Sequence, residues 1–261
     1  GGFSQQFHAQ AVEGVAVFPG LSLPAAGNYT LGAVSGALST GADSPLAVND
    51  AATFLPAGNG TWNEAASWDI AAVPNSATAR VRIPTIAADR NVNLTNHVTA
   101  AAIILDNGAA TNRNRIRNNN ATATLTLQAG VEPASITVNG SASGHANLEF
   151  TNAGSLVLAG DVVLDVQNAA AGNAEYGALR LQGNVGGPGG IIKRGPGMAG
   201  ITGAGKTFSG NVVIEQGVLT FSEPALTGNG ATNYTVQPGG QLRLSSAFAT
   251  AGVPRTNHLK G

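Results

Sequence analysis

The chain contains no cysteine in its 261 residues. Disulfide bonds and cysteine-based metal sites are therefore excluded, so the staples of many small secreted domains are missing. Aromatic residues make up only 5% of the chain, and alanine inflates the hydrophobic content of 43%. We expect a narrow core of valine, isoleucine and leucine, held together by backbone hydrogen bonds between repeated strands.

Charge is scarce as well. Charged residues make up 10% of the sequence and the formal net charge is −1, whereas an average globular domain has about 25% charged residues. Such a chain has no overall field that would attract nucleic acid or an anionic membrane surface. No stretch approaches the roughly 20 apolar residues of a membrane-spanning helix. The sequence thus predicts neither a nucleic-acid partner nor a transmembrane segment.

Glycine is abundant, with 36 copies. It has no period of three, which excludes a collagen-like helix. Instead, short apolar runs recur at spacings of about eight to twenty residues between glycine- or asparagine-rich corners, which is typical of strands. Beyond residue 78 the expected strands are Arg80–Ile83, Val92–Leu94, Ala101–Leu105, Thr124–Leu127, Ser135–Val138, Asn147–Phe150, Ser155–Leu158, Val162–Val166, Ala178–Leu181, Tyr234–Val236 and Gln241–Leu244. Three such strands per turn would form one rung of a solenoid.

The densest part of this pattern is the stretch Gly186–Phe221. Its apolar runs are short, β-branched and separated by glycine, so they predict strands and tight corners and leave no room for a helix of ordinary length. We expect one residue of each run to point into the core, namely Ile192, Val213 and Leu219.

The same stretch contains two nucleotide-binding patterns. Gly200–Thr207 matches the phosphate-loop motif, and Gly195–Gly200 matches the dinucleotide fingerprint. Both motifs need a helix after the loop, because the helix N-terminus holds the phosphates. The residues after Thr207 predict a turn and then a strand, and Pro196 interrupts the second motif. We therefore expect no nucleotide and no other cofactor.

Between Gly189 and Leu219 the chain reads Gly-Gly-Ile-Ile-Lys-Arg-Gly-Pro-Gly and later Thr-Phe-Ser-Gly-Asn-Val-Val-Ile-Glu-Gln-Gly-Val-Leu. These residues resemble the passenger-associated repeat of bacterial autotransporters. The chain departs from the repeat at Met198-Ala199-Gly200, where Thr-Leu-Thr is usual, and has an extra residue in the Gly203–Gly210 corner. The resemblance implies a parallel β-helix at the cell surface. It implies no catalytic residues, because the repeat is a structural unit.

Both tryptophans, Trp62 and Trp68, lie in one segment that ends at Asn75. It resembles the opening segment of solenoids in secreted, repeat-bearing bacterial surface proteins. The two indoles could form an aromatic sugar platform, or they could cover the open end of a core. We favour the cap, because the ends of solenoids need covering.

The carboxylates offer one candidate pair, Asp161 and Asp165, which a strand would place on the same face. This pair could bind calcium or form a lyase-type acid site. The alternative is a solvated face, or one turn residue plus one exposed residue. We favour this alternative because no third carboxylate lies nearby in the sequence and hard cations take about six or more oxygen ligands. The four histidines, His8, His97, His145 and His258, are far apart, and none has a metal-ligand neighbour at suitable spacing. No Gly-x-Ser-x-Gly elbow precedes a helix, so the sequence predicts no metal site and no catalytic residues.

The sharpest charge cluster consists of Arg113, Arg115 and Arg117. Alternation along a strand would place all three on one face. They could grip an anionic glycan or lipopolysaccharide, or they could protect an exposed strand edge by like charge. Both interpretations stay open.

Residues 1–58 predict a strand-rich arm. Ala11–Leu23 is apolar and alternating, so an open sheet edge of a neighbouring molecule could accept it as an additional strand. The chain begins with two glycines and no methionine, which is the expected result of a removed secretion signal. The residues expected to contact the neighbour are Phe3, Phe7, Val12, Val15, Val17, Phe18, Leu21 and Leu23.

The sequence as a whole predicts an all-β protein, a right-handed parallel β-helix (solenoid) over residues 59–261, with a tryptophan-containing cap at 61–75. We expect a secreted or cell-surface structural protein without enzymatic activity that binds copies of itself head-to-tail, since contacts that do not close form filaments. One alternative is a passenger fragment of an autotransporter-type adhesin, with surface glycans as partners. The other is a carbohydrate-active β-helix, either a polysaccharide lyase or a glycan-binding module, although the sequence shows no groove-forming cluster of acidic and basic residues.

Overall fold

The computed structural model describes residues 51–85, 88–107, 113–120, 122–140, 145–150, 154–169, 176–203, 205–222 and 233–244, together with the secondary structure of 27–31, 34–35, 38–39 and 44–48. Contacts divide the chain into two units, residues 1–50 and 51–261. The eight N-terminal residues expected to contact a neighbour lie outside the described residues. In the first unit, β1 (Gly27–Leu31) pairs antiparallel with β4 (Ser44–Val48), and β2 (Val34–Ser35) pairs antiparallel with β3 (Leu38–Ser39).

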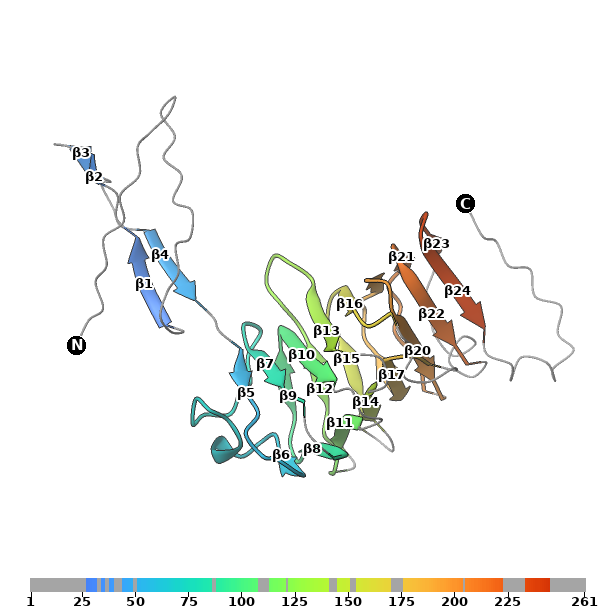
Figure 1. Ribbon diagram of the computed structural model, residues 1–261, viewed down its shortest axis with the longest axis horizontal. Coiled ribbons are helices and arrows are strands. Elements are labelled where there is room, and N and C mark those ends of the chain that lie inside the picture. Colours follow the sequence, from blue (N-terminus) through green and yellow to red (C-terminus); the bar gives the residue numbers. More distant parts are fainter. Residues whose placement is uncertain are drawn as a thin grey trace, which may run out of the picture. The chain divides into compact units, whose positions relative to one another are not determined.

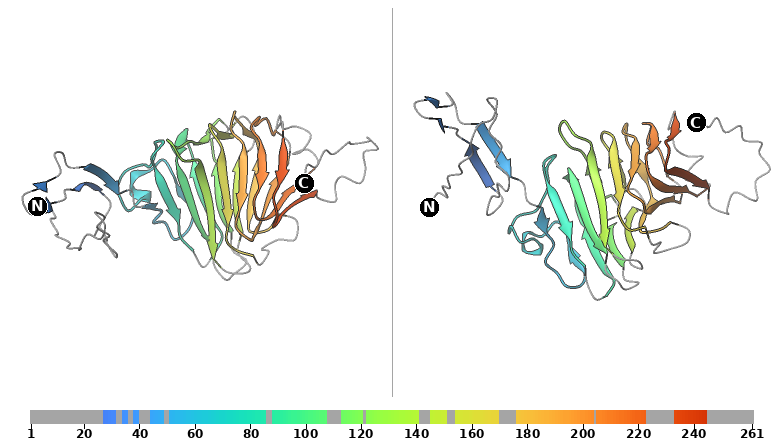
Figure 2. Two further views of the ribbon diagram at one scale, coloured as in Figure 1. Left: turned by 90° about the horizontal axis from the view of Figure 1, so that it is seen from above. Right: turned by 45° about the horizontal axis from the view of Figure 1, so that its top comes forward.

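The second unit is built from three sheets of parallel strands, shown in Figure 1 and from two further sides in Figure 2. The first sheet contains β5 (Ala52–Thr53), β7 (Arg80–Ile83), β10 (Ala102–Asn107), β13 (Ala134–Gly140), β16 (Val162–Val166), β19 (Ile191–Arg194), β21 (Val212–Ile214) and β23 (Tyr234–Val236). The second contains β6 (Gly60–Thr61), β8 (Arg90–Leu94), β11 (Arg113–Asn118), β14 (His145–Phe150), β17 (Leu179–Gly183), β20 (Met198–Thr202), β22 (Gly217–Phe221) and β24 (Gly240–Leu244). The third contains β9 (Val98–Ala100), β12 (Leu125–Leu127), β15 (Leu156–Leu158) and β18 (Val185–Gly186).

The chain visits the sheets in a fixed order. From β7 to β18 each run of three strands supplies one strand to the first, second and third sheet in turn, and we call such a run a layer. Each strand pairs with its counterpart in the next layer, so β7 pairs with β10 and β8 with β11. After β18 a single bridge between Val185 and Lys206 continues the third sheet. The prediction of an all-β fold with long parallel sheets is confirmed.

Helix is almost absent from the described residues. The one helical segment there is the 3-10 turn η1 (Ala65–Ser67). Within the same residues, no helix has the length and apolar character that a membrane crossing requires.

The core of the second unit is a set of aliphatic ladders. Strand side chains alternate between the two faces of a sheet, and one face of each sheet points inward. In the first sheet, Val81, Ile103, Ile136 and Leu164 are buried and follow one another in register across β7, β10, β13 and β16. Burying such a side chain stabilises the fold by about 1.5–3 kcal/mol, so these ladders carry much of the stability.

The prediction for Ile192 and Val213 is wrong. Both side chains are on the outer face of the first sheet, where Ile192 pairs in register with Val213, while their neighbours Ile191 and Val212 are fully buried. The prediction for Leu219 is confirmed, because its side chain is fully buried. A run of consecutive apolar residues does not fix which of them faces inward, and a shift by one residue exchanges the two faces.

Three aromatic side chains are buried at the end of the sheets formed by β5 and β6. The Trp62 and Trp68 rings meet edge-on with centroids 5.0 Å apart, and Phe54 meets Trp68 at 5.2 Å. The Trp62 indole N–H donates to the Pro74 carbonyl oxygen at 2.9 Å, and the Trp68 indole N–H donates to the Trp62 carbonyl oxygen at 2.7 Å. Both indoles are fully buried, so they present no face on which a sugar could stack.

The opposite end of the sheets is formed by β23 and β24. Tyr234, Val236 and Leu242 pack against the core there, but each is only partly buried. Leu244, the last described residue, is 37% exposed. In the described residues this end therefore terminates in aliphatic side chains and one tyrosine.

Candidate functional sites

The phosphate-loop pattern forms a corner of the sheets. It begins in β20, and the strand β21 follows it, with no helix among the described residues between them. The Lys206 ammonium group is fully buried and donates to the carbonyl oxygens of Gly183, Thr202 (2.9 Å) and Gly203 (3.0 Å). An ammonium group has three donors, and three carbonyl oxygens already receive them. This corner therefore directs its lysine inward, away from any phosphate.

Backbone conformation and close packing at the corner explain why this pattern contains glycine at three positions. Gly203 and Gly205 have φ angles of 79° and 82°, which glycine adopts without the steric cost of a Cβ atom. A Cβ atom on Gly200 would lie 2.2 Å from the Cβ atom of Tyr176, so the absent side chain makes room for the tyrosine. The corner geometry explains the motif without a ligand.

Lys193 repeats the arrangement at another corner of the same layer, the one that follows β19. Its buried ammonium group donates to the carbonyl oxygens of Arg194 (2.5 Å), Gly195 (2.8 Å) and Gln216 (3.1 Å). Burial lowers the pKa of Lys193 to about 8, although the charge of Asp165 opposes the shift. Burial also lowers the pKa of Lys206 to about 8, with a further contribution from Arg180. Both ammonium groups clamp backbone carbonyls of adjacent corners.

Arg90 is a third buried cation. Its Nε–H donates to Asn114 Oδ1 at 3.2 Å, and its terminal nitrogens donate to the carbonyl oxygens of Pro56 (2.9 Å) and Pro84. The guanidinium carbon lies 5.5 Å from the centre of the Phe54 ring. Burial lowers the pKa of Arg90 to about 10. The sequence did not predict these three cations, because each has at least one partner that only strand pairing brings close. These partners are Asn114 for Arg90, Gln216 for Lys193 and Gly183 for Lys206.

The three clustered arginines lie on the outer face of the second sheet, as their alternation indicates: in β11 the residues between them, Asn114 and Ile116, are buried. Arg113 donates to Asp89 Oδ2 through Nε (3.0 Å) and Nη2 (2.8 Å), and Arg115 Nη2 donates to the same oxygen at 2.9 Å. Among the described residues Arg117 has no carboxylate partner within ion-pair distance.

Asp89 thus neutralises part of the cluster. Burial raises the pKa of this carboxyl, but the hydrogen bonds from Arg113 and the charges of Arg113 and Arg115 outweigh burial and lower the pKa overall. Glu149 lies 3.8 Å from Arg115 and adds a second negative charge. Two of the three arginines are therefore already paired, which leaves less free charge for an anionic glycan.

His145 lies directly beside Arg113 in the strand register between β11 and β14. It is 9% exposed, and neither ring nitrogen has a hydrogen-bond partner among the described residues. Its ring meets Tyr176 edge-on at 5.7 Å, and the Arg180 guanidinium lies 4.6 Å from the centre of the Tyr176 ring. Sequence reasoning did not identify this cluster, because only the strand register brings these groups together.

The aspartates Asp161 and Asp165 do not act as a pair. Asp161 Oδ1 accepts a hydrogen bond from the Gly190 backbone N–H at 2.7 Å, whereas Asp165 Oδ1 accepts one from Gln167 Nε2 at 2.6 Å. Asp161 lies in a corner before β16, and Asp165 lies within that strand. No group of three or more histidine, aspartate or glutamate side chains suited to a metal ion occurs among the described residues.

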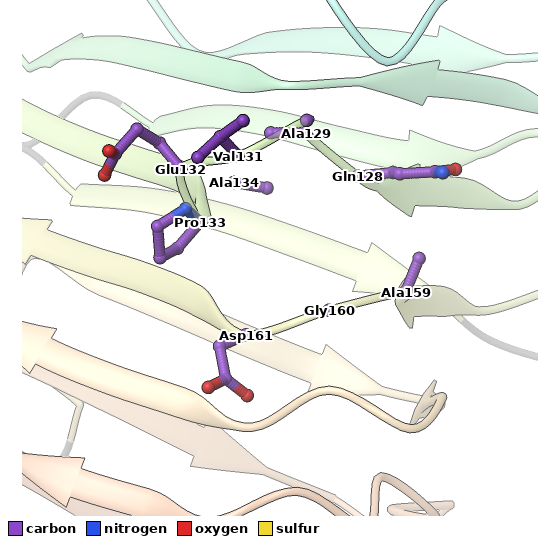
Figure 3. Close-up of a pocket in the computed structure, with 10 residues that line it drawn as sticks. Gln128, Ala129, Val131, Glu132, Pro133, Ala134, Ala159, Gly160 and Asp161 are labelled. Carbon is purple, nitrogen blue, oxygen red and sulfur yellow. The ribbon is translucent and has the colours of Figure 1, made fainter.

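A shallow groove of about 420 Å³ lies between two adjacent corners, residues 128–134 and 159–161. Figure 3 shows Glu132 on one corner and Asp161 on the other. Val131 on the longer corner is fully exposed. The lining contains two carboxylates and no histidine, lysine or arginine, so it offers no pairing of acidic and basic groups for catalysis.

No protein-family model, curated protein or solved structure matches the chain. The geometric features described above therefore carry the functional proposal.

Proposed function

We propose that this chain is a non-enzymatic structural protein of the bacterial cell surface that assembles head-to-tail into a filament. The observation that carries the proposal is the difference between the two ends of the sheets. Phe54, Trp62 and Trp68 are buried at one end, whereas Val236 and Leu242 are partly exposed at the other.

The proposal includes a right-handed parallel β-helix as the scaffold. The fixed order in which the chain visits three parallel sheets supports it. Connections between parallel strands of one sheet are right-handed in about 98% of cases. The resemblance of Gly189–Leu219 to the autotransporter repeat also points to such a scaffold, and to an extracellular location.

The last described strands, β23 and β24, offer an attachment surface. A terminal strand has unpaired backbone N–H and C=O groups on its free side, which form a template for another strand. Tyr234, Val236 and Leu242 would be covered if a further layer were added. We propose that the N-terminal residues of the next copy, within Phe3–Leu23, supply that layer. Backbone hydrogen bonds would give affinity and alternating side chains would give register.

Deletion of Gly1–Leu23 tests which segment is donated. The truncated chain should fold and remain monomeric in analytical ultracentrifugation, while the full chain forms fibres that electron microscopy detects. Fibres from the truncated chain, or a full chain that stays monomeric at high concentration, would overturn the proposal and favour the adhesin-passenger alternative.

A matched pair of substitutions tests the accepting surface. Val236→Glu places a charge among the apolar side chains at the end of the core and should abolish assembly. Thr235→Glu changes the adjacent residue of β23, whose side chain is exposed, and should leave assembly intact. Equal effects of the two substitutions on fibre formation would show that this end is not the attachment surface.

Glycan binding by the arginine cluster has less support. Arg113 and Arg115 share the carboxylate of Asp89, so a glycan anion would have to compete with an existing partner. We therefore do not propose a glycan as the principal partner.

A further inference from the structure

The surroundings of His145 combine three features that rarely occur together. The imidazole is nine-tenths buried, both of its nitrogens lack hydrogen-bond partners in the part of the chain that the structure describes, and the charges of nearby arginines act on the ring. Buried polar groups in folded proteins are usually hydrogen-bonded. An unpartnered histidine in a positively charged environment therefore calls for an explanation.

The charged and titratable groups around the ring come from each strand packed against it. Arg113 and Arg115 lie on β11, Arg180 and Tyr176 lie on or just before β17, and Asp89 lies just before β8. Glu149 is on the strand of His145 itself and accepts a hydrogen bond from Asn147 at 3.0 Å. Asp89 is already bonded to two arginines, so its negative charge is largely compensated.

In the neutral state the imidazole is compatible with this site. The ring packs edge-on against Tyr176 and adds no charge to the arginines. A protonated ring would be a buried cation for which the described residues supply no hydrogen-bond acceptor. It would lie beside Arg113, its register partner, and would feel the positive charges of Arg115 and Arg180 as well. Both burial and like charge disfavour the charged form.

We propose that His145 is an acid-sensitive element of the second sheet, and that protonation of its ring separates β14 from β11 and β17. This strand lies in the middle of the sheet, between β11 and β17. Its loosening would therefore interrupt the ladder on both sides. The inference concerns the subunit alone and does not depend on the proposed assembly.

The direction of the effect follows from proton linkage. Burial, followed by the charges of Arg113, Arg115 and Arg180, lowers the pKa of His145, and Asp89 only partly opposes this. The unfolded chain, with a histidine pKa of about 6.5, then binds the proton more readily than the folded chain. The contribution of His145 to stability is complete above about pH 6.5 and is lost as the pH falls through the folded-state pKa.

The experiment compares thermal unfolding of the parent chain, His145→Gln and His97→Gln at about pH 7.5 and about pH 5.5, a window chosen around the ordinary histidine pKa. His97 is the matched control, because it is exposed and bonded to Thr124 at 2.8 Å. Acidification should lower the melting temperature of the parent and of His97→Gln by a few °C more than that of His145→Gln, on the scale expected for a domain of this size. Hydrogen exchange at the lower pH should increase first in β14.

Equal acid sensitivity of the parent and His145→Gln would overturn the inference. If His145→Gln does not fold, an NMR titration of the four histidines in the parent chain decides the question. The inference requires His145 to titrate below the ordinary histidine pKa of about 6.5, and a midpoint for His145 at or above that value would refute it.

Discussion

The two ends of the sheets close the same kind of core in different ways. At the β5–β6 end, three aromatic rings fill the cross-section, and both indole N–H groups donate to backbone carbonyls. At the β23–β24 end, the described residues present Tyr234, Val236 and Leu242 with their side chains partly exposed. Large rings with satisfied donors terminate a stack, whereas aliphatic side chains continue the pattern of the layers below them.

The two ends also differ in how many of the chain's few aromatic side chains they contain. Both tryptophans and Phe54 gather at a single end, whereas the other buried rings, Phe150, Phe208 and Phe221, are distributed among the aliphatic ladders. Similar layers can be added to one another without limit, because each layer leaves the same kind of apolar surface for the next. Residues outside the repeated strands must therefore cover the last layer, and the segment between β5 and β7 does so at one end.

Removal of an aromatic ring from the β5–β6 end should have the largest effect on stability and tests whether the two ends differ. Trp62→Ala should cost about 3–5 kcal/mol of unfolding free energy, as is usual for truncating a buried aromatic residue. Tyr234→Ala at the other end should cost clearly less, because the side chain is only partly buried. Urea unfolding of both variants measures the difference, and similar losses would show that the two ends are equally closed.

A second pair of variants compares two adjacent layers. Leu219 and Leu242 are register partners on β22 and β24, and Leu219 is fully buried whereas Leu242 is partly exposed. Leu219→Ala should cost about 2–5 kcal/mol, and Leu242→Ala should cost less in the monomer. If Leu242 is covered by a neighbouring copy, its substitution should become more costly under conditions that favour assembly.

The buried cations predict different responses to alkali. Arg90 packs on Phe54 of the capped end, and burial lowers its pKa to about 10, whereas burial lowers the pKa of Lys206 to about 8. The unfolded lysine, near 10.5, binds a proton in a range where the folded lysine has released it. The free energy of unfolding should therefore rise between about pH 8 and about pH 10.5, by about 1–3 kcal/mol for this lysine.

The Lys206→Met variant should show a smaller rise, because Lys193, whose pKa burial also lowers to about 8, still contributes. Urea unfolding of the parent and the variant at several pH values provides the measurement, with Lys193→Met as a second test because its amine has the same carbonyl environment. An unchanged pH dependence in both variants would mean that the lysines are not the titrating groups.

The smallest expected effect is that of a nucleotide. Mg–ATP should leave the melting temperature unchanged, since the Lys206 amine already donates to three carbonyl oxygens. A nucleotide-dependent increase in melting temperature that Lys206→Ala abolishes would contradict this interpretation of the corner.

Local patterns in the sequence predicted local features well. The alternation of Arg113, Arg115 and Arg117 placed them on one face, because the side-chain period of a strand is two. The glycine-rich corners and short apolar runs predicted strands in the right places, such as Val162–Val166, which is β16. These features depend only on neighbouring residues.

Features that depend on register were not predictable in the same way. Strand pairing decides whether Ile191 or Ile192 faces inward. Lys193 is buried on the same face as Ile191, and three backbone carbonyl oxygens accept hydrogen bonds from its ammonium group. Asp89 reaches Arg113 across 24 residues of sequence. No pattern in a single sequence reports such distant contacts, so both the buried lysines and the His145 cluster required the structure.

The strand register also has a consequence for the order in which the chain folds. Paired residues of neighbouring layers are only a few tens of residues apart along the sequence: Ile103 and Ile136 are 33 residues apart, and Ile192 and Val213 are 21 residues apart. Each new layer therefore closes one short loop onto strands that already exist, and the entropic cost of closure grows only slowly with loop length. Folding can then proceed one layer at a time. Unfolding would begin at β24, where Leu242 is only partly buried and Leu244 is exposed, so partly unfolded molecules would retain their aromatic end and release their aliphatic end first.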